Sequence, residues 1–290
     1  MANISKAETT PKQSSRSLKS VFLFLGVFFT VIFCLAPILW QILTSFKTNE
    51  AIASIPTIYF PSFNQLTLEH YISLGLPFLQ YVLNSAFVSF TSTLFCLAIG
   101  APAAYTLARL RIPGENIILA FVLIVTLFPY VLLFLGLLEV VKFFGLGNNY
   151  LALIIPYTAI NLPLTILVLR SFFQQLPKDL EDSAKVDGYN TVSMLLNIVL
   201  PMTTPALITT GILTFIFAWN EFIFALTFIT RENLYTIPVA VAQLGGASVY
   251  EIPYGPIAAA TIAGTLPLII LVLIFQRRIV QGITAGAVKG

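Results

Sequence analysis

The chain has 290 residues, of which 58% are hydrophobic and only 9% are charged, and its formal net charge at pH 7 is +3. Soluble domains carry roughly 25% charged residues, so this composition indicates an integral membrane protein. It also excludes a nucleic-acid-binding protein, because the sequence has no basic face interleaved with aromatic residues.

Residues suited to chemistry are scarce in this sequence. His70 is the single histidine, and Cys34 and Cys96 both lie inside apolar segments, where a small buried side chain is more common than a disulfide. There is no spacing typical of metal ligands and no Gly-x-x-x-x-Gly-Lys-Ser/Thr phosphate-binding loop. We therefore expect no catalytic site, no metal site and no cofactor bound by the chain itself.

Six segments are long and apolar enough to cross a bilayer, which takes about 20 residues of α-helix. They follow a polar stretch at residues 1–19, and a charged segment separates the fourth from the fifth. The sequence predicts an all-α polytopic membrane protein with spans at residues 20–46, 81–108, 116–138, 150–169, 203–227 and 255–275.

The basic residues divide unequally between the two sides that six spans define. Twelve of the fifteen fall on the side of the termini, against Lys47, Lys142 and Arg231 on the other. Loops rich in lysine and arginine stay in the cytoplasm, so both termini are predicted to be cytoplasmic. With five or seven spans, the basic residues would no longer be concentrated on one side of the membrane. The twelve are Lys6, Lys12, Arg16, Lys19, Arg109, Arg111, Arg170, Lys178, Lys185, Arg277, Arg278 and Lys289.

The charged segment at residues 171–201 has the signals of two short helices joined by a turn. Pro177 suits a first helical turn, and acidic residues follow it, where they favour the positive end of the helix dipole. Gly188 is predicted to end this helix, and Asn190 or Thr191 to cap the next. In that second helix Val192, Leu195, Leu196 and Val199 recur at helical spacing. We call residues 176–201 the knob.

The knob contains an acidic-small-small triplet, Asp182-Ser183-Ala184, followed at fixed spacing by Gly188, Ile198 and Leu200-Pro201. This pattern resembles the cytoplasmic EAA loop in the membrane subunits of binding-protein-dependent ABC importers. The spacing matches throughout, although Asp182 replaces the usual glutamate and Ser183 the first alanine. The resemblance implies a helical knob that enters a cleft of the ATPase subunit through Leu180, Asp182, Ser183, Ala184, Asp187, Gly188, Ile198 and Pro201.

Further marks narrow the resemblance to the carbohydrate-uptake branch of these importers, specifically its MalG-like half. They are Asn84-Ser85, Ala104-Tyr105 with Arg109, the stretch at 219–222, and the C-terminal stretch at 282–290. The resemblance implies a permease domain at residues 20–278 and cytoplasmic tails at 1–19 and 279–290. The C-terminal tail would either reach the ATPase through Thr284, Gly286 and Lys289 or be a frayed terminus.

The same resemblance implies the function and the partners. The chain would be a permease subunit in the inner or plasma membrane, importing a sugar, oligosaccharide or polyol conjugate. Its partners would be membrane lipid, a second, MalF-like permease subunit, a dimer of ATPase subunits that bind ATP and Mg²⁺, and an extracytoplasmic solute-binding protein.

Glu221 is the one acid well inside an apolar segment, where a carboxylate costs about 2.5 to 3.5 kcal/mol. Three roles are open: structural hydrogen bonding, lining the translocation path together with Asn220, and solvation at the membrane interface. A protein of another class, a proton-coupled secondary transporter that uses Glu221, is the alternative. The absence of a visible inverted repeat and the presence of the knob count against it.

Overall fold

The computed structural model of the protein describes residues 14–110, 112–245 and 252–287, and its regular elements there are helices. Four of these helices are long and apolar enough to cross a membrane: α1 (Ser14–Phe46), α3 (Glu69–Arg109), α6 (Leu151–Phe173) and α13 (Tyr254–Ala287). Two bent pairs meet the same test together, so the described residues contain four spans, or up to six if each pair counts as one. The all-α membrane fold is therefore confirmed, and the count of six stays a prediction.

The first bent pair is α4 (Glu115–Leu127) with the segment that contains η2 (Tyr130–Leu133) and α5 (Phe134–Phe143), at 89°. The predicted third span is thus broken, and the break falls at Phe128 and Pro129, both in extended backbone. Proline cannot donate a backbone hydrogen bond, and it disfavours helical geometry in the residue before it. The sequence alone accounts for this bend.

The second bent pair joins the end of the knob to α10 (Thr204–Asn220), at 81°. The predicted fifth span, residues 203–227, is wrong as a single helix, because the chain leaves helical geometry at Glu221 before α11 (Ile223–Phe228) begins. The remaining short helices are α2 (Asn49–Ala53), η1 (Phe63–Gln65), α7 (Lys178–Val186), α8 (Thr191–Met194), η3 (Leu195–Val199), α9 (Leu200–Met202), η4 (Glu232–Leu234) and α12 (Ile237–Leu244).

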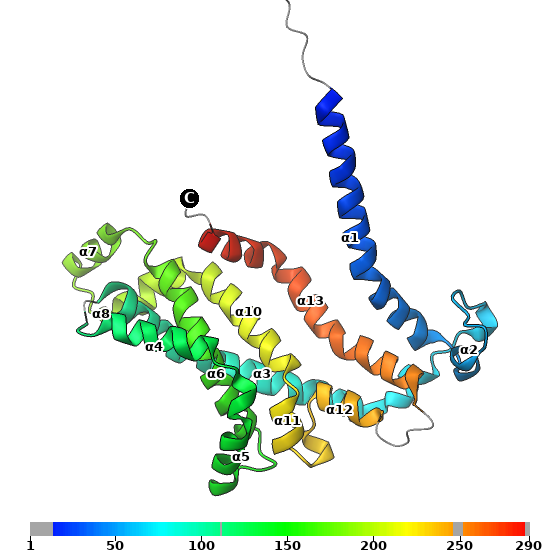
Figure 1. The fold of residues 1–290 in the computed structure, drawn as a ribbon. Coiled ribbons are helices and arrows are strands. Elements are labelled where there is room, and N and C mark those ends of the chain that lie inside the picture. The colour runs from blue at the N-terminus through cyan, green and yellow to red at the C-terminus, as the bar shows by residue number, and fades with distance from the viewer. Residues whose placement is uncertain (1–13, 111, 246–251, 288–290) are drawn as a thin grey trace, which may run out of the picture.

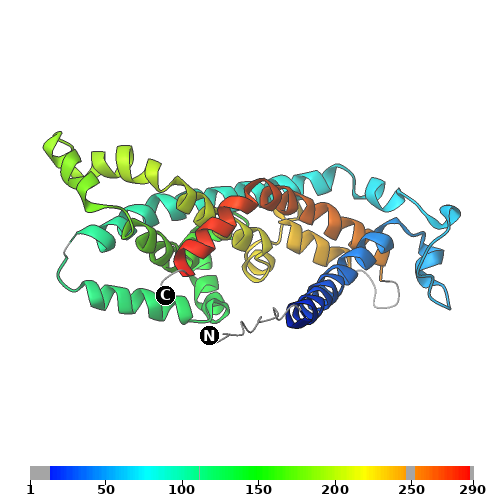
Figure 2. The same ribbon diagram turned by 90° about the horizontal axis from the view of Figure 1, so that it is seen from above.

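The core of the bundle is made by α3, α6, α10 and α13, and α3 packs closely along α6 (Figures 1 and 2). A Cβ atom added at Gly100 of α3 would lie 2.7 Å from Thr165 Cγ2 of α6, so only glycine permits this approach. By contrast, α1 extends away from the bundle, and residues 20–40 are all exposed. This apolar surface suits contact with lipid or with another membrane chain.

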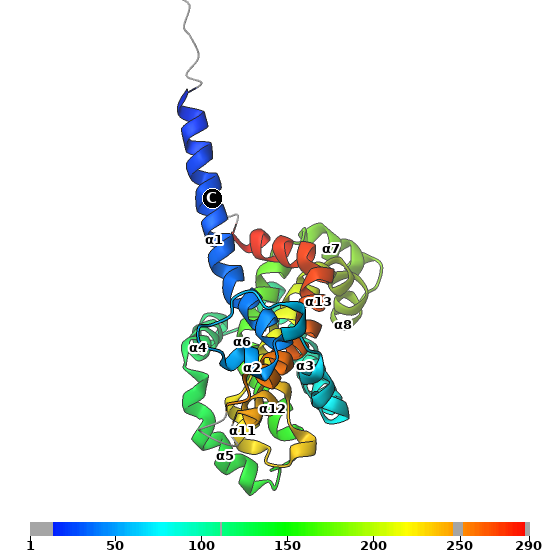
Figure 3. The ribbon, with the colours of Figure 1, turned by 90° about the vertical axis from the view of Figure 1, so that its right-hand side faces the viewer.

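The two ends of the bundle differ in what they carry. Figures 1 and 3 show α7, α8, the first turns of α1 and the last turns of α13 at one end, and α5, α11 and α12 at the other. The predicted six-span topology also places these two groups of elements on opposite sides. The helix α13 continues through Ala287, so the predicted C-terminal tail at 279–290 begins as an extension of the last span.

Asn84 ties the far end of the bundle together, which gives a reason for one of the sequence marks. Its Nδ2 donates to the carbonyl oxygens of Asn233 at 3.0 Å and Tyr235 at 2.9 Å. Its Oδ1 accepts from the Tyr150 hydroxyl at 2.7 Å. Next to it, Ser85 Oγ accepts from the Ile237 amide at 2.8 Å. The Asn84-Ser85 pair therefore positions the segment before α12.

Candidate functional site: the knob and its seat

The knob folds locally as two short helices around a glycine turn. α7 ends where Gly188 adopts a φ of +85°, a conformation that favours glycine. The amide of Tyr189 donates to Ala184 O at 2.9 Å and that of Gly188 to Lys185 O at 3.1 Å, the two bonds of a Schellman cap. Asn190 Oδ1 then accepts from the Ser193 amide at 2.8 Å and caps α8. The predicted turn and the predicted cap are both present.

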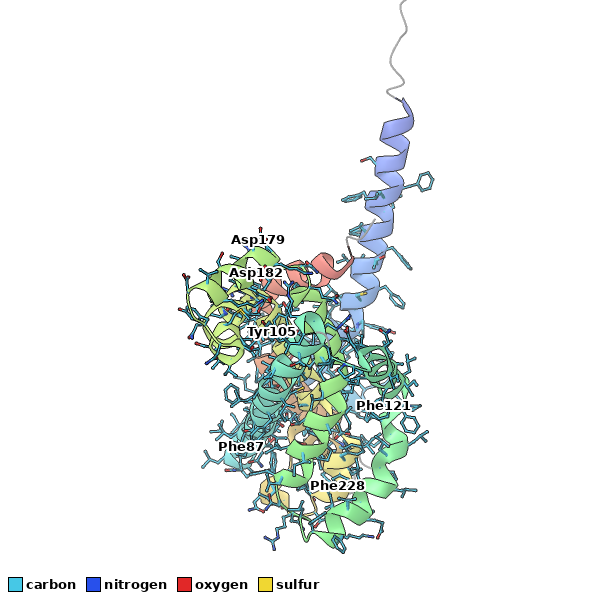
Figure 4. All side chains as sticks on the ribbon, turned by 90° about the vertical axis from the view of Figure 1, so that its left-hand side faces the viewer. Phe87, Tyr105, Phe121, Asp179, Asp182 and Phe228 are labelled. Atoms are coloured by element: carbon cyan, nitrogen blue, oxygen red, sulfur yellow. The ribbon has the colours of Figure 1, made fainter. Side chains whose placement is uncertain are left out.

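The residues that the motif singled out divide into two faces. Ala184 is buried at 3% exposure among residues of α3 and α6, including Ala104, Tyr105 and Phe173, while Leu180 and Ile198 are half-buried. The others are exposed: Asp182, Ser183, Asp187, Gly188 and Pro201. Figure 4 shows Asp179 and Asp182 at the same end of the bundle as Tyr105, with Phe228 at the opposite end. One face of the knob is seated, and the other is free.

The apolar residues that recur at helical spacing in the second helix are not all buried. Leu195 and Val199 are buried, whereas Val192 is 65% and Leu196 56% exposed. Residues Leu195–Val199 form a π-helical segment, so the second helix is not one regular α-helix. The exposed apolar side chains of the knob include Val192, Leu196 and also Val186, which is 88% exposed. We call Val186, Val192 and Leu196 the outer apolar patch.

Sequence reasoning missed the ion pair that seats the knob. Arg109, the last residue of α3, lies with its Nε 2.9 Å from Glu181 Oε1 of α7, and the two side chains are only 5% and 11% exposed. Arg109 also donates from Nη2 to the carbonyl oxygen of Leu176. Because Arg109 lies at the end of an apolar span, the sequence could predict that its charge is paired. It could not predict the partner, because no spacing rule relates Arg109 to a residue 72 positions away.

A second arginine extends this contact to the neighbouring spans. Arg170, near the end of α6, donates from Nε to Leu107 O of α3 at 2.9 Å. Its Nη2 lies 2.8 Å from Glu115 Oε1 at the start of α4. Arg109 and Arg170 therefore join the knob, α3, α6 and α4 at one end of the bundle.

Glu221 is buried at 4% exposure and fully engaged by hydrogen bonds. Its carboxylate accepts from the Tyr157 hydroxyl at 2.5 Å and from the amides of Phe224 at 3.0 Å and Ala225 at 3.2 Å. These contacts fit structural hydrogen bonding, because the carboxylate accepts hydrogen bonds from backbone amides in the first turn of α11 that have no partner within the helix. Asn220 is exposed, with its Nδ2 donating to Ile216 O at 2.8 Å. A place for Asn220 and Glu221 on a translocation path stays a prediction.

A cavity of about 560 Å³ lies beside the break between α4 and α5. Its walls are mostly apolar, with polar groups from Thr126, Tyr130 and Asn161, and neither Asn220 nor Glu221 lines it.

Of the residues implied for tail contact, Thr284 and Gly286 lie in α13, and Lys289 is outside the described residues. Over the described part of the chain, no group of three or more histidine, cysteine, aspartate or glutamate residues could hold a metal ion.

The geometry is that of an all-α membrane bundle with a helical knob at one end. The family model described as binding-protein-dependent transport system inner membrane component matches residues 96–285, which include the knob. The chain belongs to this family. It is therefore a translocation component rather than an enzyme.

Several curated proteins are similar over nearly the whole chain. The trehalose/maltose transport system permease protein MalG of Thermococcus litoralis is 39% identical, covering 94% of this chain and 98% of that protein. The trehalose transport system permease protein SugB of Mycobacterium tuberculosis is 39% identical over 89% of this chain and 93% of its own. The sulfoquinovosyl glycerol transport system permease protein SmoH of Agrobacterium fabrum is 36% identical over 99% and 100%.

The fold also has a counterpart of known structure. A chain from the crystal structure of a bacterial ABC transporter involved in the import of alginate superposes with a TM-score of 0.77. The match covers 93% of this chain and 99% of that chain, at 21% identity. This likeness establishes the fold.

Proposed function

We propose that the protein is the permease subunit of an ATP-driven importer of a sugar, oligosaccharide or polyol conjugate. The similarity to permeases named for trehalose, maltose and sulfoquinovosyl glycerol supports this substrate class. The observation that carries the proposal is the knob, which is seated on α3 and α6 by one face and presents the other to solvent. Such a surface is suited to a partner outside the membrane.

The free face of the knob is proposed as the contact with a separate ATPase subunit. It combines the outer apolar patch with the charged side chains of Asp182 and Asp187. An exposed apolar surface beside polar residues is typical of a protein–protein contact. Of the two departures from the family motif, Asp182 pairs with Lys185 at 3.1 Å, and both Asp182 and Ser183 face solvent. They therefore bear on this contact rather than on the knob's own packing.

The proposed orientation follows from the basic residues. The end of the bundle that carries the knob is proposed to be cytoplasmic, because twelve of the fifteen lysines and arginines fall on its side in the predicted topology. The opposite end, with α5, α11 and α12, would then receive substrate from an extracytoplasmic solute-binding protein.

The proposed assembly contains this chain, a second permease subunit and two ATPase subunits that bind ATP and Mg²⁺. Closure of the ATPase dimer would bring the knobs together, and the spans would open outward to take the substrate. Because α4 with α5 and the knob with α10 are bent pairs, the bundle has places where rigid segments can change their relative angle.

Cysteine crosslinking tests this proposal. In a variant whose Cys34 and Cys96 are replaced by serine, Val186→Cys in the outer apolar patch is expected to crosslink to the ATPase subunit in membranes of the native cell. Ile55→Cys is the matched control, because Ile55 is 98% exposed and lies on the opposite side in the predicted topology. An ATPase crosslink from Ile55→Cys but none from Val186→Cys would overturn the proposal.

A further inference from the structure

The contact between Arg109 and Glu181 is unusual for its burial. Charged side chains are rarely so enclosed unless they are paired, and this pair is enclosed at the junction of a membrane span with the knob. By comparison, the Asp182–Lys185 pair on the same α7 has side chains 70% and 60% exposed. An exposed pair of this kind contributes little to stability, whereas breaking a buried pair leaves an unpaired charge in the interior.

The position of the pair strengthens the junction. Arg109 lies in the last turn of α3, where the helix dipole stabilises a positive charge. Glu181 lies in the first turns of α7, where the dipole of that helix stabilises a negative charge. Arg109 Nη2 donates in addition to Leu176 O, in the connection between α6 and α7. One side chain of α3 therefore contacts the knob both at its helix and at the chain segment leading into it.

Besides Glu181, the buried residue of α7 is Ala184. Ala184 belongs to the same buried cluster as Ala104, Tyr105 and Phe173. The attraction between the two buried charges holds α7 against the end of α3.

We infer that the Arg109–Glu181 pair is the connection that makes the knob and α3 move as one body, and that both are positioning residues for coupling. The inference rests on the proposed function, since it assumes that the knob receives movement from an ATPase subunit. Arg170 then passes the same displacement on, because it joins α6 to Leu107 of α3 and to Glu115 of α4. Neither arginine nor Glu181 needs to touch the ATPase for this role.

The test compares transport with ATP hydrolysis in the complete complex purified from the native cell and reconstituted in vesicles. Glu181→Gln and Arg109→Lys keep the side-chain size or the charge. Both complexes are expected to assemble and to hydrolyse ATP at near the normal rate. The number of trehalose or maltose molecules imported per ATP hydrolysed is expected to fall about tenfold, within the range typical of coupling between sites.

Reversing the charges tests whether coupling depends on the attraction between the two residues or on each residue separately. Arg109→Glu and Glu181→Arg are each expected to lose coupling, and the double variant is expected to regain part of it, because the attraction is restored although the dipole preference is not. The matched control is Lys142→Gln, which removes an exposed pair with Glu139 at 3.0 Å in α5. It should leave the ratio of import to hydrolysis unchanged.

Two outcomes would overturn the inference. In one, Glu181→Gln and Arg109→Lys assemble and import sugar with the normal ratio to hydrolysis. In the other, both fail to assemble, which would give the pair a role in folding alone. The Val186→Cys crosslink tests the proposed function independently of the ion pair. If the crosslink forms but the pair variants have normal coupling, the knob contacts the ATPase and only the role inferred for the pair is wrong.

Discussion

Replacing Glu221 with leucine is expected to destabilise the bundle strongly. The substitution leaves the Tyr157 hydroxyl and the amides of Phe224 and Ala225 without their acceptor in a buried site. Each unpaired buried group costs about 1–3 kcal/mol. Part of this cost is offset because the leucine variant no longer carries the desolvation penalty of a buried carboxylate. We expect a net loss of about 2–4 kcal/mol, seen as a fall of several degrees in the thermal unfolding midpoint of the purified protein.

Two milder variants act as controls for this prediction. Glu221→Gln keeps one acceptor oxygen, so its loss of stability should be roughly half as large. Tyr157→Phe removes only the hydroxyl that donates to the carboxylate, which should cost about 1 kcal/mol. If Glu221→Leu has a normal unfolding midpoint but abolishes transport, Glu221 belongs to the translocation path instead. If Glu221→Gln stops transport and the wild type needs a proton gradient, the proton-coupled alternative gains support.

Replacing Gly188 with valine is expected to uncouple ATP hydrolysis from uptake while the protein still inserts into the membrane. At a φ of +85° a side chain with a branched Cβ is strained by about 1–2 kcal/mol or more, even though no atom lies within 4 Å of the added Cβ. That strain shifts the balance between the observed turn and other turns by about 5- to 30-fold. The free face of the knob would then be displaced, and uptake per ATP hydrolysed should fall accordingly.

Gly145 provides a matched control for the Gly188 variant. It has a φ of +63° and open space around its Cβ position, but it lies between α5 and α6, at the opposite end of the bundle. Gly145→Val therefore introduces the same kind of strain without touching the knob, and coupling should be retained. Gly188→Asn should be the mildest change, because asparagine tolerates this conformation better than other residues. Equal loss of coupling from Gly145→Val and Gly188→Val would contradict the expectation.

The knob shows which features can be predicted from the sequence. Its turn at Gly188 and its cap at Asn190 depend on contacts within a few residues, so local rules were sufficient. The bend at Pro129 was equally accessible, since proline acts on its own backbone and on that of the residue before it.

The break between α10 and α11 could not be predicted in the same way. No proline or glycine lies at Asn220, Glu221 or Phe222, and the break is stabilised by Tyr157, which is 64 residues away. The pairing of Arg109 with Glu181 depends likewise on how α3 meets the knob. Both features come from tertiary packing, which outweighs local preference and leaves no period or spacing in the sequence.

We propose that this chain carries sugar across the membrane by using the work of a separate ATPase. The most direct measurement purifies the tagged complex from its native cell with the solute-binding protein and follows ATP hydrolysis in vesicles. Hydrolysis is expected to rise when the binding protein is loaded with a sugar such as trehalose or maltose, and that sugar should accumulate inside with ATP but without a proton gradient. Co-purification of no ATPase, together with uptake that depends on the proton gradient alone, would contradict the claim.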